Sequence, residues 1–165
     1  MAAHAHTLHA HGEIAAPAAE VWAVITDVER FGEILRSVQD SQLLTDGAYD
    51  VGTRWRESRH FFDHKGVEEI EVIEINPGIH TMHRTVIDKD VIVTAYNLTS
   101  IHNVTRLSIT ATAHMEARGL ASYAVWRMFG GLDKAQTHKM MEHDIEDFAA
   151  EVARRTTSAS DSSAS

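Results

Sequence analysis

The sequence predicts an α+β fold in which a curved antiparallel sheet of six to seven strands wraps around a long C-terminal helix, with two short helices after the first strand. Three patterns support it: a short alternating segment near the start, a long series of alternating segments separated by turn residues, and a helical stripe near the end. An antiparallel sheet with one apolar face must have that face covered. Only the last helix is long enough to cover it.

The first strand and the two short helices follow from residues 8–35. Leu8, Ala10 and Ile14 alternate with histidine and glutamate, which is typical of a strand with one covered face. Pro17 occupies the position at which proline best opens a helix. Thr26 and the aspartate after it can cap a second short helix.

The middle of the chain alternates with a period of two and predicts five or six strands. Turn-like sequences rich in Asp, Asn, Gly and Pro separate them. Connections this short make consecutive strands antiparallel neighbours. The predicted strands lie at about 38–45, 53–62, 66–75, 79–87, 91–101 and 104–115.

After Gly119 the pattern becomes helical. Met141, Ile145 and Phe148 share one stripe, which predicts a long helix. The two adjacent glycines at 130–131 mark either a kink or the start of the regular part. We expect residues 1–7 to be flexible, residues 8–155 to form a single domain, and the polar residues 156–165 to be disordered.

Composition narrows the function classes. The 165 residues include no cysteine, and 24 acidic against 15 basic side chains give a formal charge of −9, which disfavours nucleic acid as a partner. No apolar run approaches the roughly 18 residues of a membrane span, and the first residues lack a signal-peptide layout, so we expect a cytoplasmic protein without membrane insertion. The oligomeric state is left open between monomer and homodimer.

The sequence gives no support for a metal or a cofactor. It has 12 histidines, but they do not fall at the spacing of a metal site, and no nucleotide-binding glycine motif or nucleophilic serine elbow occurs. We therefore predict a site that works without either.

Four segments, in this order and at this spacing, resemble the polyketide cyclase/dehydrase branch of the helix-grip superfamily, also called SRPBCC or START-like. They are Ile14–Asp27, Val51–Trp55, Glu71–Pro77 and Asn103–Leu107. The resemblance implies the helix-grip fold and an internal cavity for a small, largely apolar molecule. It does not fix the activity, because such folds include aromatase/cyclases, other enzymes and non-catalytic binders.

Alternation within the strand at 53–62 selects one group of candidate site residues. Trp55, Glu57 and Arg59 share a face, and burial of the tryptophan favours that face as the inner one. Glu57 and Arg59 are then candidate catalytic residues that orient a carbonyl or enol. The alternative is an ion pair on the solvent side, because a shift of one residue in register reverses every assignment.

Two further strands contribute polar side chains to the expected cavity. Thr81, His83 and Thr85 share the face that the resemblance directs inward, and Thr94 and Tyr96 share the corresponding face of the next strand. His83 is a candidate general base and Tyr96 a candidate proton donor, with the three threonines as ligand contacts. Each can equally be a structural residue with a satisfied hydrogen bond.

The last strand and the helix complete the expected lining. Ile109 and Ala111 give the last strand an apolar inner face with small residues, and Met141 supplies a pliable helix contact. Extending the helical stripe backwards reaches His138, a fifth candidate catalytic residue. A single histidine on an apolar face is also a common core residue.

The sequence therefore favours a cofactor-independent enzyme of the lyase or isomerase type that promotes cyclisation, aromatisation or dehydration of a polyketide-like or aromatic molecule. Positioning supplies most of the catalysis in such a site. The alternative is a carrier or sensor that binds a hydrophobic ligand without changing it.

Overall fold

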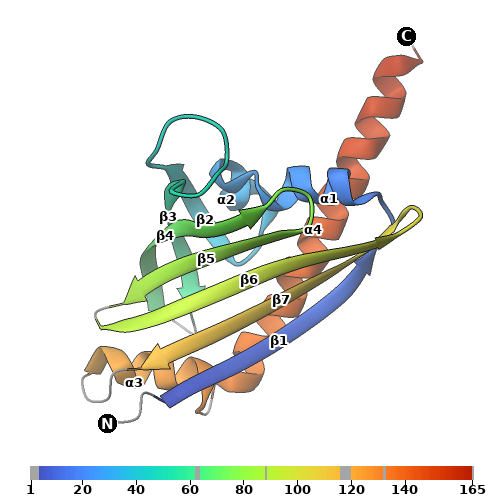
Figure 1. Ribbon diagram of the computed structural model, residues 1–165. Coiled ribbons are helices and arrows are strands. Elements are labelled where there is room, and N and C mark those ends of the chain that lie inside the picture. Colours follow the sequence, from blue (N-terminus) through green and yellow to red (C-terminus); the bar gives the residue numbers. More distant parts are fainter. Residues whose placement is uncertain (1–3, 62–63, 88, 116–119, 132, 165) are drawn as a thin grey trace.

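The computed structural model describes residues 4–61, 64–87, 89–115, 120–131 and 133–164. Seven antiparallel strands form one sheet in the order β1-β7-β6-β5-β4-β3-β2, and the long helix α4 lies across its inner face (Figure 1). The strands are β1 (His4–Ile14), β2 (Val38–Leu43), β3 (Arg54–Phe61), β4 (His64–Asn76), β5 (His80–Ile87), β6 (Asp90–Ile101) and β7 (Val104–Met115). The helices are α1 (Ala18–Ile25), η1 (Val28–Arg30), α2 (Phe31–Ile34), α3 (Leu120–Phe129) and α4 (Lys134–Ser163). The predicted helix-grip fold is confirmed.

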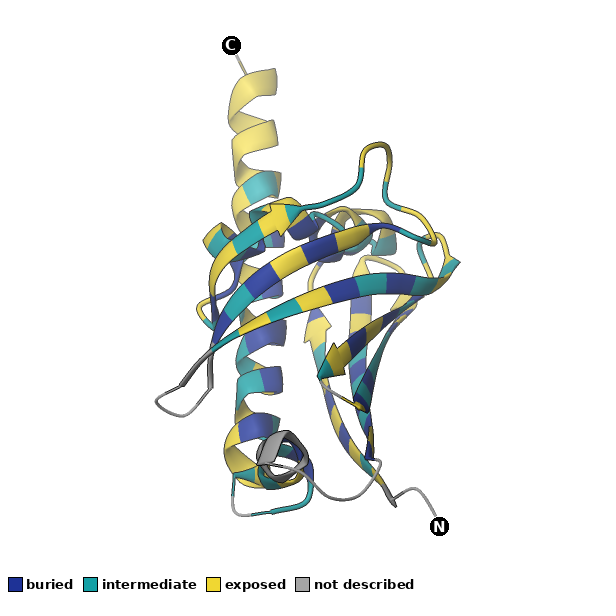
Figure 2. Ribbon diagram, turned by 90° about the vertical axis from the view of Figure 1, so that its left-hand side faces the viewer, coloured by how far each residue is buried: buried dark blue, intermediate teal, exposed yellow. Residues whose placement is uncertain are grey.

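The core lies between the sheet and α4. Buried and exposed positions alternate along the strands, and the part of α4 that crosses the sheet buries one side (Figure 2). On β1, a Cβ atom at Gly12 would lie 2.8 Å from Ile145 Cγ2, so this glycine allows α4 to approach the strand closely. That contact sets how near the helix stands to the sheet.

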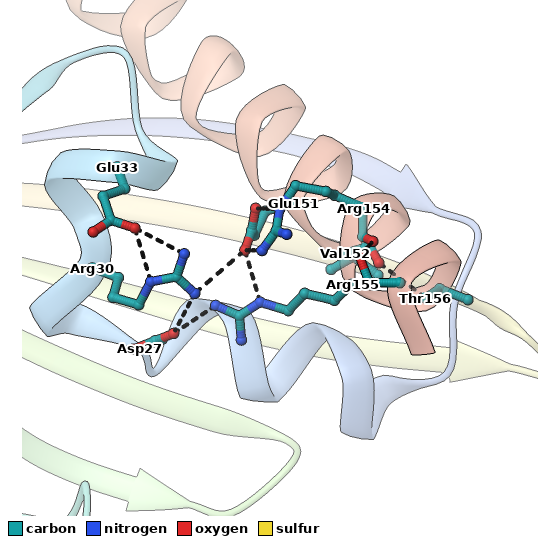
Figure 3. Close-up of polar contacts among 9 residues, drawn as sticks. Asp27, Arg30, Glu33, Glu151, Val152, Arg154, Arg155 and Thr156 are labelled. Carbon is teal, nitrogen blue, oxygen red and sulfur yellow. Dashed lines mark hydrogen bonds and ion pairs between the residues drawn. The ribbon is translucent and has the colours of Figure 1, made fainter. Parts of the chain in front are cut away.

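The short helices close one end of the sheet. Phe31 of α2 packs edge-on against Trp55 at a centroid distance of 6.3 Å and lies 5.7 Å from the ring of Phe148 on α4. Outside this aromatic contact, Arg155 bonds both Asp27 and Glu151 (Figure 3). These interactions join α4 to the segment between β1 and β2.

The structure differs from the expected ends of the domain. β1 begins at His4 rather than at residue 8, because residues 4–7 pair with residues 112–115 of β7. Helix α4 continues to Ser163, through the tail that we predicted to be disordered. There the hydroxyl groups of Thr156 and Ser158 bond backbone carbonyls four residues earlier, which satisfies them within the helix.

The two adjacent glycines separate α3 from α4. The N–H groups of Gly130 and Gly131 both bond the carbonyl of Trp126, at 2.8 and 2.7 Å, and α4 begins at Lys134. A Cβ atom on Gly130 would lie 2.7 Å from the ring of His6, so a glycine here lets the end of α3 rest against β1. The glycines therefore mark the start of the regular helix. Among the described residues, no helix is both long and apolar enough to cross a membrane.

Candidate functional site

A cavity of about 90 Å³ lies between the inner face of the sheet and the helices α3 and α4. Its walls are mainly aromatic and apolar, with side chains from β3 to β7 on one side and methionines from both helices on the other. Phe31 of α2 and Phe129 of α3 also line it. A small set of polar side chains enters this apolar space, and their arrangement determines its chemistry.

A buried network of polar side chains is centred on Arg59. Its Nε donates to Glu57 Oε1 at 2.5 Å, and its Nη1 donates to Asp144 Oδ2 on α4 at 3.0 Å. The second oxygen of Glu57 accepts from Trp55 Nε1 at 3.0 Å, and that of Asp144 accepts from Ser37 Oγ at 2.6 Å. Burial opposes the charge on Arg59, but Glu57 and Asp144 raise the pKa of its guanidinium well above its ordinary value. The network fixes the helix to the sheet inside the cavity.

Glu68 of β4 is a third carboxylate in the lining. It lies directly opposite Glu57 in the antiparallel register of β3 and β4. Burial raises the pKa of Glu68 to about 7; Arg59 opposes this shift and Glu57 adds to it. Glu68 is therefore a group in the cavity that changes its protonation near neutral pH.

His83 lines the cavity and contacts a tyrosine hydroxyl. Its Nε2 and the Oγ1 of Thr81 are each 2.7 Å from the hydroxyl of Tyr49, which comes from the connection between β2 and β3. Burial, followed by the nearby Arg59, lowers the pKa of His83 to about 3. The imidazole is therefore neutral and only weakly basic.

Tyr96 completes the polar set from β6. Its ring lies 4.8 Å from that of His83, which in turn is 4.9 Å from the ring of Trp55. Burial raises the pKa of Tyr96 above its ordinary value, so its hydroxyl stays protonated and remains available as a hydrogen-bond donor. The cavity thus combines a neutral phenol, a neutral imidazole and the carboxyl group of Glu68, whose pKa is about 7.

The structure brings most of the predicted residues together. Ten line the cavity: Glu57, Arg59, His83, Tyr96, Trp55, Thr85, Thr94, Ile109, Ala111 and Met141. Thr81 does not line it; this buried side chain supports Tyr49 and also bonds the carbonyl of Glu74. The structure thus places Thr81 behind Tyr49, and its contact with a ligand stays a prediction.

His138 also lies outside the cavity. Its side chain is 40% exposed, and its Nε2 is 2.7 Å from the carbonyl oxygen of His9 on β1. The inner stripe of α4 instead runs through Thr137, Met141 and Asp144. Because neighbouring residues on a helix point about 100° apart, the backward extension of the stripe selected the wrong member of the pair 137–138.

Three important residues were missed by sequence reasoning. Asp144 falls on the stripe of Met141 and Ile145, so a charged residue at a core position was an available signal. Glu68 shares its strand face with the buried Ile70, which was a second signal. Tyr49 lies in an irregular connection, where no periodicity indicates which way a side chain points.

Comparison with known proteins identifies the family. The family model described as "Polyketide cyclase / dehydrase and lipid transport" matches residues 14–142. The chain belongs to this family. A search of curated proteins finds no match.

Solved structures share the fold of this polyketide cyclase/dehydrase family member at low sequence identity. The Zhui aromatase/cyclase from Streptomyces sp. R1128 is 18% identical, with a TM-score of 0.70 over 93% of this chain and 96% of that one. Norcoclaurine synthase from Thalictrum flavum, solved as a point mutant with a transition-state analogue, is 10% identical, with a TM-score of 0.66 over 94% and 99%. A START superfamily protein from Mycobacterium smegmatis is 13% identical, with a TM-score of 0.60 over 83% and 98%.

Proposed function

We propose that the protein binds a small, largely apolar molecule of polyketide-like or aromatic type in this cavity and promotes its cyclisation, aromatisation or dehydration without a cofactor. The observation that carries the proposal is the position of the Arg59 network and Glu68 within an otherwise aromatic and apolar cavity. Apolar walls with a few fixed polar groups are typical of small-molecule sites. Membership of the polyketide cyclase/dehydrase family supports the same class of ligand.

The polar groups suggest distinct roles. Tyr96 donates a hydrogen bond to a carbonyl oxygen of the ligand, which makes the hydrogen on the neighbouring carbon more acidic. Glu68 accepts that proton and returns it to a departing hydroxyl group, so that water leaves and no further acid is needed. Glu57 and Asp144 fix the guanidinium of Arg59, so that its positive charge stays at one position in the cavity. His83, with a pKa of about 3, orients Tyr49 rather than acting as the base.

Positioning contributes at least as much as proton transfer in this proposal. Holding a flexible chain in a reactive geometry supplies about 7 kcal/mol or more. The cavity of about 90 Å³ is smaller than a typical ligand pocket of roughly 300–1,000 Å³. Met128 and Met140, which line it from α3 and α4, are unbranched and can change rotamer to admit a larger ligand.

The second candidate function is a carrier or sensor for a hydrophobic ligand. One observation favours it: both oxygens of Glu57 and both oxygens of Asp144 already accept hydrogen bonds inside the protein. The family description also includes lipid transport. In this case Glu68 and Tyr96 orient the ligand and transfer no proton.

Product analysis by mass spectrometry separates the two functions. The protein is incubated with aromatic and polycarbonyl intermediates, and the wild type is compared with Glu68→Gln and His83→Ala. Catalysis predicts that Glu68→Gln lowers turnover at least about tenfold, whereas His83→Ala has a smaller effect. Glu69→Gln is the matched control, because Glu69 is exposed on the outer face of the same strand and pairs with Arg54 and Arg56. Cyclisation alone leaves the mass unchanged, so chromatographic retention is compared as well. Tight binding of a ligand that is recovered with unchanged mass and unchanged retention contradicts the enzyme and supports the carrier.

A further inference from the structure

Among the described residues, the cavity lining holds more negative than positive charge. Its described acidic residues are Glu57, Glu68 and Asp144, and its one described basic residue that carries a charge is Arg59. His83 adds no charge, because its pKa is about 3. With the carboxylates ionised, the three acids and one base leave an excess of two negative charges in a partly enclosed space. A buried excess of this kind is costly unless a cation or a proton balances it.

Arg59 already forms hydrogen bonds with two of the three described carboxylates of the lining, Glu57 and Asp144. Its Nε bonds Glu57 and its Nη1 bonds both Asp144 and Ser37. No described residue donates a hydrogen bond to Glu68 or forms an ion pair with it. Glu68 is therefore the lining carboxylate that still has its acceptor capacity available to a ligand.

The register of β3 and β4 brings two of these negative charges close together, which favours a positive counter-charge beside them. Glu57 and Glu68 are direct cross-strand partners on the inner face, and like charges in that arrangement destabilise a sheet. A positive group of the ligand beside Glu68 removes the repulsion. An anionic ligand, such as a carboxylate, increases it.

The apolar walls suit the remainder of such a ligand. Trp55, Tyr96 and Phe31 present aromatic rings to the same cavity. Aromatic rings pack against an apolar skeleton, and their faces also attract an ammonium group. The lining thus offers an ion-pair partner and an aromatic enclosure within one site.

We infer that the ligand is a small aromatic molecule that carries a basic amine, and that Glu68 pairs with its ammonium group. This inference rests on the proposed function and narrows its ligand class. It makes Glu68 a specificity-determining residue that selects cationic over neutral ligands and neutral over anionic ones.

Three probes with one skeleton test this order: 2-phenylethylamine, 2-phenylethanol and 3-phenylpropionate. Calorimetric titration at pH 8 keeps the alkylamine protonated, because alkylammonium groups have a pKa near 10. The expected result is an amine affinity at least about tenfold above that of the alcohol, with the carboxylate weakest. Glu68→Gln is expected to remove the advantage of the amine while changing the affinity of the alcohol less than about twofold.

Two further variants keep the test decisive. Glu68→Asp retains the charge and is expected to retain the preference for the amine, and Glu69→Gln, on the outer face, is expected to change neither affinity. If the alcohol binds but the amine binds no tighter, or if Glu68→Gln keeps the preference, the inference is wrong and the proposed function stands. If the wild type binds none of the three probes, both are contradicted.

Discussion

The protein contains two networks of arginines and carboxylates that differ in balance and in exposure. The rim network joins the segment after β1 to residues 151–155 of α4, and six side chains form it (Figure 3). They are Asp27, Arg30, Glu33, Glu151, Arg154 and Arg155. The cavity network contains Arg59 with Glu57 and Asp144, and Glu68 lies beside it.

Because the two networks differ in charge balance and exposure, we assign a structural role to the rim network and propose a functional role for the cavity network. At the rim, three positive charges meet three negative ones, and several of these side chains are half-exposed or exposed. In the cavity, one arginine serves carboxylates whose side chains are no more than 9% exposed, and a further acid has no partner among the described residues. Ion pairs that are balanced in charge and accessible to solvent contribute little to stability. We propose that a bound cation or a proton balances the excess charge of the cavity network.

The largest expected effect comes from removing the arginine of the cavity. Arg59→Met is expected to lower the free energy of unfolding by about 3–5 kcal/mol, because Glu57 and Asp144 lose the positive charge that neutralises them inside the protein. At the rim, Arg155→Met is expected to cost about 1 kcal/mol or less. Urea denaturation of both variants at pH 7 measures the difference. Equal losses would mean that the two networks do not differ as described.

The next effect is the pH dependence caused by Glu68. Its pKa is about 7 in the folded chain against an ordinary value of 4.5, so the folded state binds the extra proton. The associated stability is fully present below pH 4.5 and is lost as the pH rises through about 7. A loss of roughly 1–2 kcal/mol is expected, after allowance for partial exposure of the carboxyl group.

Stability curves from pH 4.5 to pH 8.5 for the wild type and Glu68→Gln test this slope. The variant should be flatter over this range and should be relatively more stable at the alkaline end. Parallel curves would show that Glu68 titrates normally.

The smallest effect is expected at the rim, with the opposite sign. Arg154, followed by Arg155, lowers the pKa of Glu151 to about 2. Its contribution is therefore present above pH 4.5 and is lost as the pH falls through about 2. Glu151→Gln should lower stability at pH 7 by about 1 kcal/mol or less and reduce the acid sensitivity of the protein. Thermal unfolding at pH 7 and pH 3 provides the measurement, and an unchanged difference between the two pH values would contradict it.

The fold was predictable because the alternating segments, the turn residues and the helical stripe all indicated the same architecture. Alternation placed Trp55, Glu57 and Arg59 on the inner face, and the structure has all three buried there. Periodicity is reliable in such long regular strands. It fails where the backbone is irregular, as at Tyr49, and where two adjacent helical residues compete for one stripe, as at 137–138.

The contacts between the site residues were less predictable than the side of the sheet on which these residues lie. Asp144 and Arg59 are 85 positions apart in the sequence, so their ion pair depends on how α4 crosses β3. The basicity of His83 and the acidity of Glu68 depend on burial, which no local pattern specifies. Residue type identified possible chemistry, but the packed environment sets the pKa of His83 and of Glu68.

A crystal structure with 2-phenylethylamine would show whether Glu68 binds the ammonium group of a ligand in the cavity. The predicted result places the ring among Trp55, Tyr96 and Phe31, with the nitrogen about 3 Å from a carboxylate oxygen of Glu68. The Arg59 network should remain intact around it. A ligand bound outside this cavity, or one that turns its nitrogen away from Glu68, would contradict the account.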